Sequence, residues 1–180
     1  IVSREPVPAP EVYGDMVRSA LDVFAKGDVN KIVLSRTMDV TLDCPLDYGR
    51  VLPDLLARNA QGYTFAVPAW TGEGTATQGV MVGASPELLV RREGDRIFVN
   101  PLAGSIGRHS DPEIDQARRE GLAVSEKDLR EHGYVVRDIV RILREHCDEL
   151  DVPEGPSVIG TDALWHLSTF IQGELHDPGM

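Results

Sequence analysis

The sequence predicts an α+β fold in which antiparallel sheets are flanked by helices. Segments with strand character occur in neighbouring pairs, and helical segments precede or follow these pairs instead of alternating with single strands. No glycine-rich turn leads from a strand into a helix, so the sequence lacks the pattern of a dinucleotide- or phosphate-binding βαβ unit. Antiparallel pairing is therefore favoured over a regular parallel sheet.

The first half of the chain is predicted to start with an extended lead-in and a helix. Residues 1–10 hold three prolines, which favours extended backbone. Apolar residues recur at helical spacing over residues 12–26, and Gly27 is expected to end that helix. After this come a predicted strand over residues 31–42, a helix over 47–59, a strand over 63–70, a small-residue loop over 71–78 and a strand over 80–84.

The second half is predicted to open with a hairpin and to continue into helices. Pro86 interrupts a strand, because proline donates nothing to a sheet ladder. The turn signal over residues 93–95 joins strands over 88–92 and 96–99. Further predictions are a small-residue loop over residues 101–105 and helices over 111–124 and 127–150, whereas 164–175 shows no clean period.

Composition excludes several classes of protein. The 180 residues are 42% hydrophobic and 26% charged, which is ordinary for a globular domain. A net charge of −11 without a Lys/Arg block argues against nucleic-acid binding, and no apolar run is long enough to span a bilayer. Two distant cysteines fit a reducing cytoplasm, with Cys147 expected as a buried thiol on the last helix. The initial Ile1 suggests a processed or excised piece.

Two carboxylates at the head of the helix over residues 127–150 form a candidate metal site. Asp128 and Glu131 are three residues apart and share a helical face that continues with apolar residues. Two like charges beside an apolar interior need a compensating cation, and a hard divalent metal with oxygen ligands would serve. The alternative is a solvated first turn, where acidic groups favour the helix N-terminus.

Lys31 and Glu87 are candidates for general base and general acid. Lys31 opens an apolar strand, and loss of solvation there would lower its pKa towards that of a base. Glu87 follows the bend at Pro86 and precedes apolar residues, which favour its protonated form. The ordinary alternatives are a lysine whose amine reaches water and a surface carboxylate paired with Arg91.

Two further segments are candidates for ligand contact. Ala103, Gly104 and Ser105 lie among small residues after a strand, where bare amides suit a carboxylate or another anion. His166 lies between apolar neighbours, where a histidine is more often a satisfied core residue than a catalytic one.

Taken in order, these segments resemble the chorismate-utilising enzymes, and most closely the siderophore-type isochorismate synthases. The resemblance runs from about residue 31 to residue 175. It rests on KIVLSR (31–36), ASPEL (84–88), PLAGS (101–105), SEKD followed by EH (125–132) and WHL (165–167). It implies the fold of anthranilate synthase component I, with residues 1–180 as the central part of the chorismate-binding domain.

The resemblance also implies roles. Lys31 would activate the water that attacks C2 of chorismate, and Glu87 would protonate the departing C4 hydroxyl. Glu131 would bind Mg²⁺, with Asp128 acting near the metal. The loop of Ala103, Gly104 and Ser105 would meet the substrate carboxylate, and His166 would contact the substrate.

The implied activity is isochorismate synthase, an Mg²⁺-dependent isomerisation. Salicylate synthase, which adds pyruvate elimination, is one alternative, and a catalytically inactive fragment that only binds is another. The resemblance implies that the family's N-terminal and C-terminal portions lie outside these 180 residues, among them a further metal glutamate and a substrate-binding arginine. We expect a monomer or a weak homo-oligomer through the sheet edges that the missing strands would leave exposed. Siderophore and menaquinone biosynthesis both begin at isochorismate and both stay open.

Overall fold

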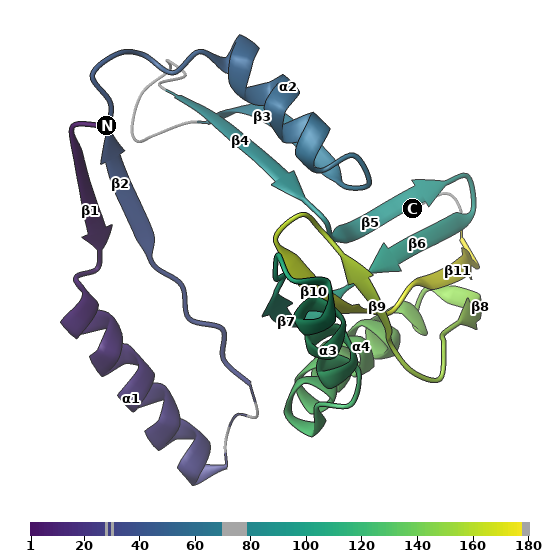
Figure 1. Cartoon of the computed structure of the whole chain (residues 1–180). Helices are drawn as coiled ribbons and strands as arrows, with labels where there is room; N and C mark the ends of the chain where they lie inside the picture. The colour runs from purple at the N-terminus through teal and green to yellow at the C-terminus, as the bar shows by residue number, and fades with distance from the viewer. Residues whose placement is uncertain (28, 30, 70–78, 178–180) are drawn as a thin grey trace. The chain divides into compact units, whose positions relative to one another are not determined.

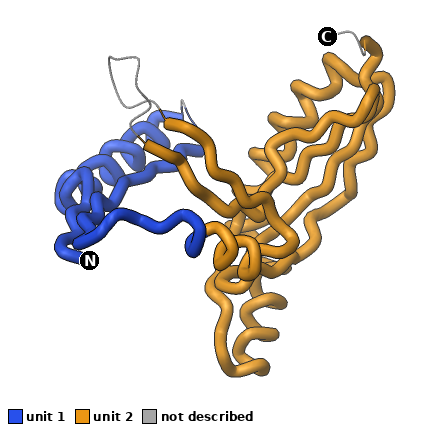
Figure 2. Tube along the Cα trace, turned by 90° about the horizontal axis from the view of Figure 1, so that it is seen from above, with its two compact units in different colours: residues 1–51 blue, residues 52–180 orange. Residues whose placement is uncertain are grey.

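The computed structural model describes residues 1–27, 29, 31–69 and 79–177. The chain forms two compact units, residues 1–51 and residues 52–180, which Figure 2 distinguishes by colour. Within the described residues, no helix combines the length and apolar character that crossing a membrane requires.

The first unit holds one long helix and a two-stranded antiparallel sheet (Figure 1). Helix α1 spans Pro10–Lys26 and ends at Gly27, whose φ of 80° gives the left-handed C-cap that the sequence predicts. Strand β1 (Ser3–Val7) pairs with β2 (Thr37–Thr41). The expected lead-in is therefore partly a strand, which tolerates Pro6 because a two-stranded sheet leaves one edge of each strand open.

The predicted strand over residues 31–42 is shorter than expected. Only Thr37–Thr41 forms β2, because only these residues pair with β1. Residues 31–36 are irregular, and the carbonyl of Leu34 accepts a hydrogen bond of 3.3 Å from the Tyr13 hydroxyl of α1. Lys31 therefore lies in a coil segment before the sheet.

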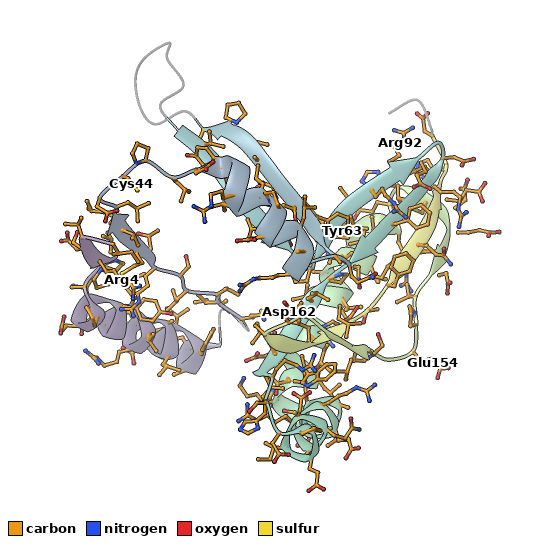
Figure 3. The ribbon with its side chains drawn as sticks, turned by 45° about the horizontal axis from the view of Figure 1, so that its top comes forward. Arg4, Cys44, Tyr63, Arg92, Glu154 and Asp162 are labelled. Atoms are coloured by element: carbon orange, nitrogen blue, oxygen red, sulfur yellow. The ribbon has the colours of Figure 1, made fainter. Side chains whose placement is uncertain are left out.

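Helix α2 and a hairpin follow. Helix α2 (Tyr48–Arg58) matches the predicted helix and contains Pro53. Strands β3 (Tyr63–Ala69) and β4 (Gly79–Ser85) form an antiparallel pair that begins at Tyr63, labelled in Figure 3. Asn59, just after α2, donates to the carbonyl of Ser85 at 3.3 Å and ties the helix to the end of β4. The predicted loop over residues 71–78 lies outside the described residues.

A four-stranded antiparallel sheet with the order β5-β6-β11-β8 follows. Strands β5 (Leu88–Glu93) and β6 (Arg96–Asn100) form the predicted hairpin, and Arg92 near its turn (Figure 3) donates to the Gly94 carbonyl. The segment over residues 164–175, whose sequence shows no clean period, supplies two strands. One of them, β11 (Ile171–Leu175), lies between β6 and β8 (Cys147–Asp151).

A three-stranded sheet with the order β7-β10-β9 carries two helices. Its strands are β7 (Leu102–Gly107), β10 (Leu164–Ser168) and β9 (Ser157–Gly160), and Asp162 lies in the turn between the last two (Figure 3). Helices α3 (Pro112–Ala123) and α4 (Glu126–Leu143) contact β7 and β10 (Figure 1). The predicted loop over residues 101–105 is therefore largely a strand.

The last predicted helix is also too long. Helix α4 ends at Leu143, and Cys147 lies in β8 instead of extending the apolar face of the helix. Pairing with β11 provides hydrogen bonds that override the helical periodicity. The Cys147 thiol is half-buried, and burial raises its pKa. The core of the described residues consists of Leu88, Ile97, Phe98, Val99, Leu122, Leu167 and Ile171.

Candidate active site

Strand β7 contains a bulge at Gly104, and this bulge shapes the candidate site. The pairing of β7 with β10 shifts between Ser105↔His166 and Leu102↔Ser168, so two residues of β7 face Leu167 alone. Gly104 has a φ of 86°, which a residue with a side chain rarely adopts. A Cβ added there would lie 3.0 Å from Cβ of Asp128. Glycine thus lets β7 approach the start of α4.

Glu87 is held by the beginning of the same strand. Its Oε1 accepts a hydrogen bond of 3.0 Å from the backbone N–H of Leu102. A turn supports this position, because the Ser85 hydroxyl accepts from the Glu87 N–H at 3.1 Å. The break that Pro86 causes between β4 and β5 therefore places the Glu87 carboxylate against β7. Glu87 is nevertheless exposed, unlike the apolar setting that was expected.

His166 lies directly across the ladder from Ser105. Its Nδ1 and the Ser105 Oγ are 2.7 Å apart. The imidazole is buried, with 8% of the residue exposed, and Nε2 makes no hydrogen bond within the described part of the chain. Burial lowers the pKa of His166, and the nearby Glu87 carboxylate opposes this shift. A neutral ring with one unused nitrogen is the result.

A second histidine, His132, fastens α4 to β7. The ring is 2% exposed, and its Nδ1 donates to the carbonyl of Ala103 at 3.1 Å. Nε2 lies 2.7 Å from Oγ1 of Thr169, just after β10. No role for His132 is predicted from the sequence, although it follows Asp128 by one helical turn and so shares its face. It fixes the distance between the helix and the bulged strand.

Asp128 and Glu131 stand at the start of α4, as predicted. Ser125 caps the helix, and its hydroxyl lies 2.5 Å from Oδ2 of Asp128. Lys127 Nζ lies 3.6 Å from Asp128 Oδ1 and 3.3 Å from Glu131 Oε1. The hydrogen bond to Glu131 and the two carboxylate charges raise the pKa of Lys127. The sequence predicted the need for a cation but did not identify this lysine, which the i,i+4 spacing to Glu131 could have indicated.

These two carboxylates fit a magnesium ion in part. Both reach the same ammonium group, so their oxygens can also serve one metal ion. Mg²⁺ often takes only one or two protein carboxylates and completes its shell with water and ligand oxygens. Among the described residues, no cluster of three or more His, Cys, Asp or Glu side chains could hold a metal. Asp128 and Glu131 are thus part of a possible shell.

An ion pair beneath β10 braces the strand that carries His166. Asp115 of α3 is 8% exposed and accepts from Arg108 Nε at 2.9 Å and from the Trp165 indole N–H at 3.0 Å. The Arg108 guanidinium also lies over the Trp165 ring, 3.9 Å from its centroid. The hydrogen bond from Arg108 lowers the pKa of Asp115. The network therefore holds Trp165, the residue before His166, and includes none of the candidate site residues.

The predicted site residues therefore divide between the units. Ala103, Gly104 and Ser105 belong to β7, and Ala103 provides the carbonyl for His132. Three further predicted residues contact this strand: Glu87, Asp128 and His166. Glu131 and Asp128 both form ion pairs with Lys127. Lys31 belongs to the first unit, where it is half-buried.

Comparison with known proteins decides the family. A family model described as "Chorismate binding enzyme" matches residues 1–179. The chain belongs to the chorismate-binding enzyme family. It is 45% identical over 176 residues to isochorismate synthase DhbC of Bacillus subtilis, covering 98% of the chain and 44% of that relative. It is 41% identical over 174 residues to isochorismate synthase EntC of Escherichia coli, covering 97% of the chain and 43% of EntC.

Solved structures agree with this assignment. The crystal structure of DhbC from Bacillus anthracis superposes with a TM-score of 0.92 at 45% identity, over 99% of this chain and 47% of that one. Anthranilate synthase component I of Streptococcus pneumoniae shares the fold at a TM-score of 0.76 and 23% identity, over 99% of this chain and 37% of that one. The α+β fold class and the family resemblance are thus confirmed. The chain spans less than half the length of the relatives it matches.

Proposed function

We propose that the protein to which this chain belongs is an isochorismate synthase. The observation that carries the proposal is the gathering of Glu87, Ser105, His166 and Asp128 around the bulged strand β7. Support also comes from relatives at 41–45% identity that are named isochorismate synthases. The reaction would move a hydroxyl group from C4 of chorismate to C2.

Glu87 would act as the general acid. The N–H of Leu102 occupies Oε1, which leaves Oε2 as the oxygen that can carry the transferred proton. That proton would pass to the C4 hydroxyl, which departs as water while the ring double bonds shift. Such a proton transfer typically contributes about 10²–10⁴-fold to the rate.

Lys31 would act as the general base. Its amine, in the neutral form, would take a proton from the water that attacks C2. One proton is thus taken at C2 and one is given at C4, so the substrate and the product have the same composition. The family resemblance around residues 31–36 supports this role.

Asp128 and Glu131 would hold Mg²⁺, which when bound would supply positive charge for a substrate carboxylate. The chain itself is acidic, with a net charge of −11, so a dianionic substrate needs such local compensation. Lys127 would release the two carboxylates as the metal binds. The small residues of β7 would leave room for the substrate beside them.

The test is incubation of the complete protein with chorismate and Mg²⁺, followed by chromatographic separation of the products. Isochorismate is the expected product, and Lys31→Ala is expected to abolish its formation. Salicylate with equimolar pyruvate would replace the proposal by a salicylate synthase. No turnover of chorismate, or full activity of Lys31→Ala, would refute the assignment as written.

A further inference from the structure

The contact between the Ser105 hydroxyl and the His166 ring bears on which ring nitrogen of His166 carries the proton. Neutral imidazole carries one proton, and the group bonded to one nitrogen decides which nitrogen carries it. Ser105 lies directly opposite His166 in the ladder, and its Oγ is 2.7 Å from Nδ1. A serine hydroxyl can donate or accept, so the direction of this bond must come from its geometry.

His132 provides a reference for that direction within the same molecule. A carbonyl can only accept, so the 3.1 Å contact with Ala103 requires a proton on Nδ1 of His132. In the neutral ring Nε2 must then accept, and the Thr169 hydroxyl donates to it across 2.7 Å. Hydroxyl donors generally make shorter hydrogen bonds than N–H donors. The equal distance between Ser105 and His166 fits a hydroxyl that donates to Nδ1.

The other nitrogen of His166 then carries the proton. Nε2 is buried and has no hydrogen-bond partner among the described residues. A buried donor without an acceptor is costly, so such a group in a native structure calls for an explanation. An oxygen atom of an anionic ligand would satisfy the unused N–H.

We propose that Ser105 is a positioning residue whose hydroxyl donates to Nδ1 of His166 and so holds the ring as a neutral Nε2–H donor to an oxygen of the substrate. The identity of that substrate as chorismate rests on the proposed function. This role belongs to the side chain of Ser105. The family resemblance concerns its backbone, which would meet the substrate carboxylate. It explains why a hydroxyl residue stands opposite the histidine.

The direct test is ¹⁵N NMR of the complete protein labelled at histidine, with His166→Gln to identify the signal of His166. Two-bond ¹⁵N–¹H correlations show which nitrogen carries the proton. We expect the proton on Nε2 in the wild type, a mixture of tautomers in Ser105→Ala, and recovery of the Nε2–H form in Ser105→Thr. Ser157→Ala is the matched control, because its hydroxyl bonds to the Ser168 carbonyl from the other side of β10. It should leave the tautomer unchanged.

A proton on Nδ1 of His166 in the wild type would overturn the inference, as would an unchanged tautomer in Ser105→Ala. Steady-state kinetics add a second readout. Ser105→Ala is expected to raise KM for chorismate by about 5- to 30-fold with a smaller change in kcat, and Ser105→Thr should restore it. If the tautomers behave as expected but chorismate is not converted, the proposed function fails while the role of Ser105 in setting the tautomer stands.

Discussion

The polar groups along β7 and the carboxylates at the start of α4 are held in different ways. Glu87 and His166 bond to atoms of β7, a strand whose position is fixed by its pairing with β10. Glu131 instead pairs with Lys127, whose side chain is 68% exposed. A hydrogen-bonded group on a sheet keeps its geometry, whereas an exposed ion pair exchanges partners at little cost. One region is suited to align a substrate, and the other to exchange one cation for another.

Glu87→Gln should produce the largest effect. Its amide oxygen can still accept from the Leu102 N–H, so the fold around β7 should persist while the proton donor is lost. We expect kcat for isochorismate formation to fall by about 10²–10⁴-fold. Glu93→Gln, on the exposed end of β5, is the control and should retain normal turnover. Near-normal activity of Glu87→Gln would remove the carboxylate from the proposed mechanism.

Gly104→Ala tests whether the bulge sets the approach of α4 to β7. The new Cβ would meet Cβ of Asp128 at 3.0 Å and Cδ1 of Leu167 at 3.1 Å, in a backbone conformation with a φ of 86°. We expect the free energy of unfolding in urea to fall by about 2–4 kcal/mol.

Gly94→Ala separates the backbone term from the contact term. Gly94 also has a positive φ, 66°, but its added Cβ meets nothing within 4 Å. Its cost should be about 1–2 kcal/mol. Equal losses of unfolding free energy in Gly104→Ala and Gly94→Ala would mean that the approach of α4 to β7 does not require the absence of a Cβ at Gly104.

Lys127→Met addresses the other region. Removing the ammonium takes away both a competitor for Asp128 and Glu131 and a repulsive charge near them. Since exposed ion pairs are worth only about 0–1 kcal/mol, Mg²⁺ binding measured by titration calorimetry should tighten by about two- to fivefold. Lys26→Met, at the end of α1, should leave the affinity unchanged. Weaker binding in Lys127→Met would show that the lysine supports the metal instead.

The pH dependence of His166 gives the smallest effect. Because burial lowers its pKa from the ordinary value of 6.5, the unfolded chain binds a proton more readily than the folded one. Folding stability should therefore decrease as the pH falls below about 6.5, and His166→Gln should reduce that slope. Exposed His176→Gln serves as the control. An identical slope in wild type and His166→Gln would contradict the burial of a neutral ring.

Local signals predicted most helices and hairpins correctly. The left-handed cap at Gly27 and the hairpin around Gly94 depend on residues close together in the chain. Strand β7 was missed because Ala103, Gly104 and Ser105 have little strand propensity, and the strand forms through a partner some 60 residues later in the sequence. The end of α4 was missed for the same reason, since β8 depends on pairing with β11.

The candidate site also contains residues that the sequence indicates and contacts that it does not. Residue types at motif spacing indicated Glu87, Asp128, Glu131 and His166, because carboxylates and imidazoles are recognisable in sequence. The hydrogen bond between Ser105 and His166 could not be predicted, because it depends on the register of two strands and on a bulge between them. The roles of Lys31 and of magnesium stay predictions.

The contacts of Trp165 with Arg108 and Asp115 make this residue of β10 a fluorescence reporter. The chain has two tryptophans, and Trp165 immediately precedes His166. Indole emission responds to a cation over the ring and to the acceptor of its N–H, and Trp165 has both. In a Trp70→Phe background, stopped-flow fluorescence would follow ligand capture at the neighbouring imidazole without any added dye.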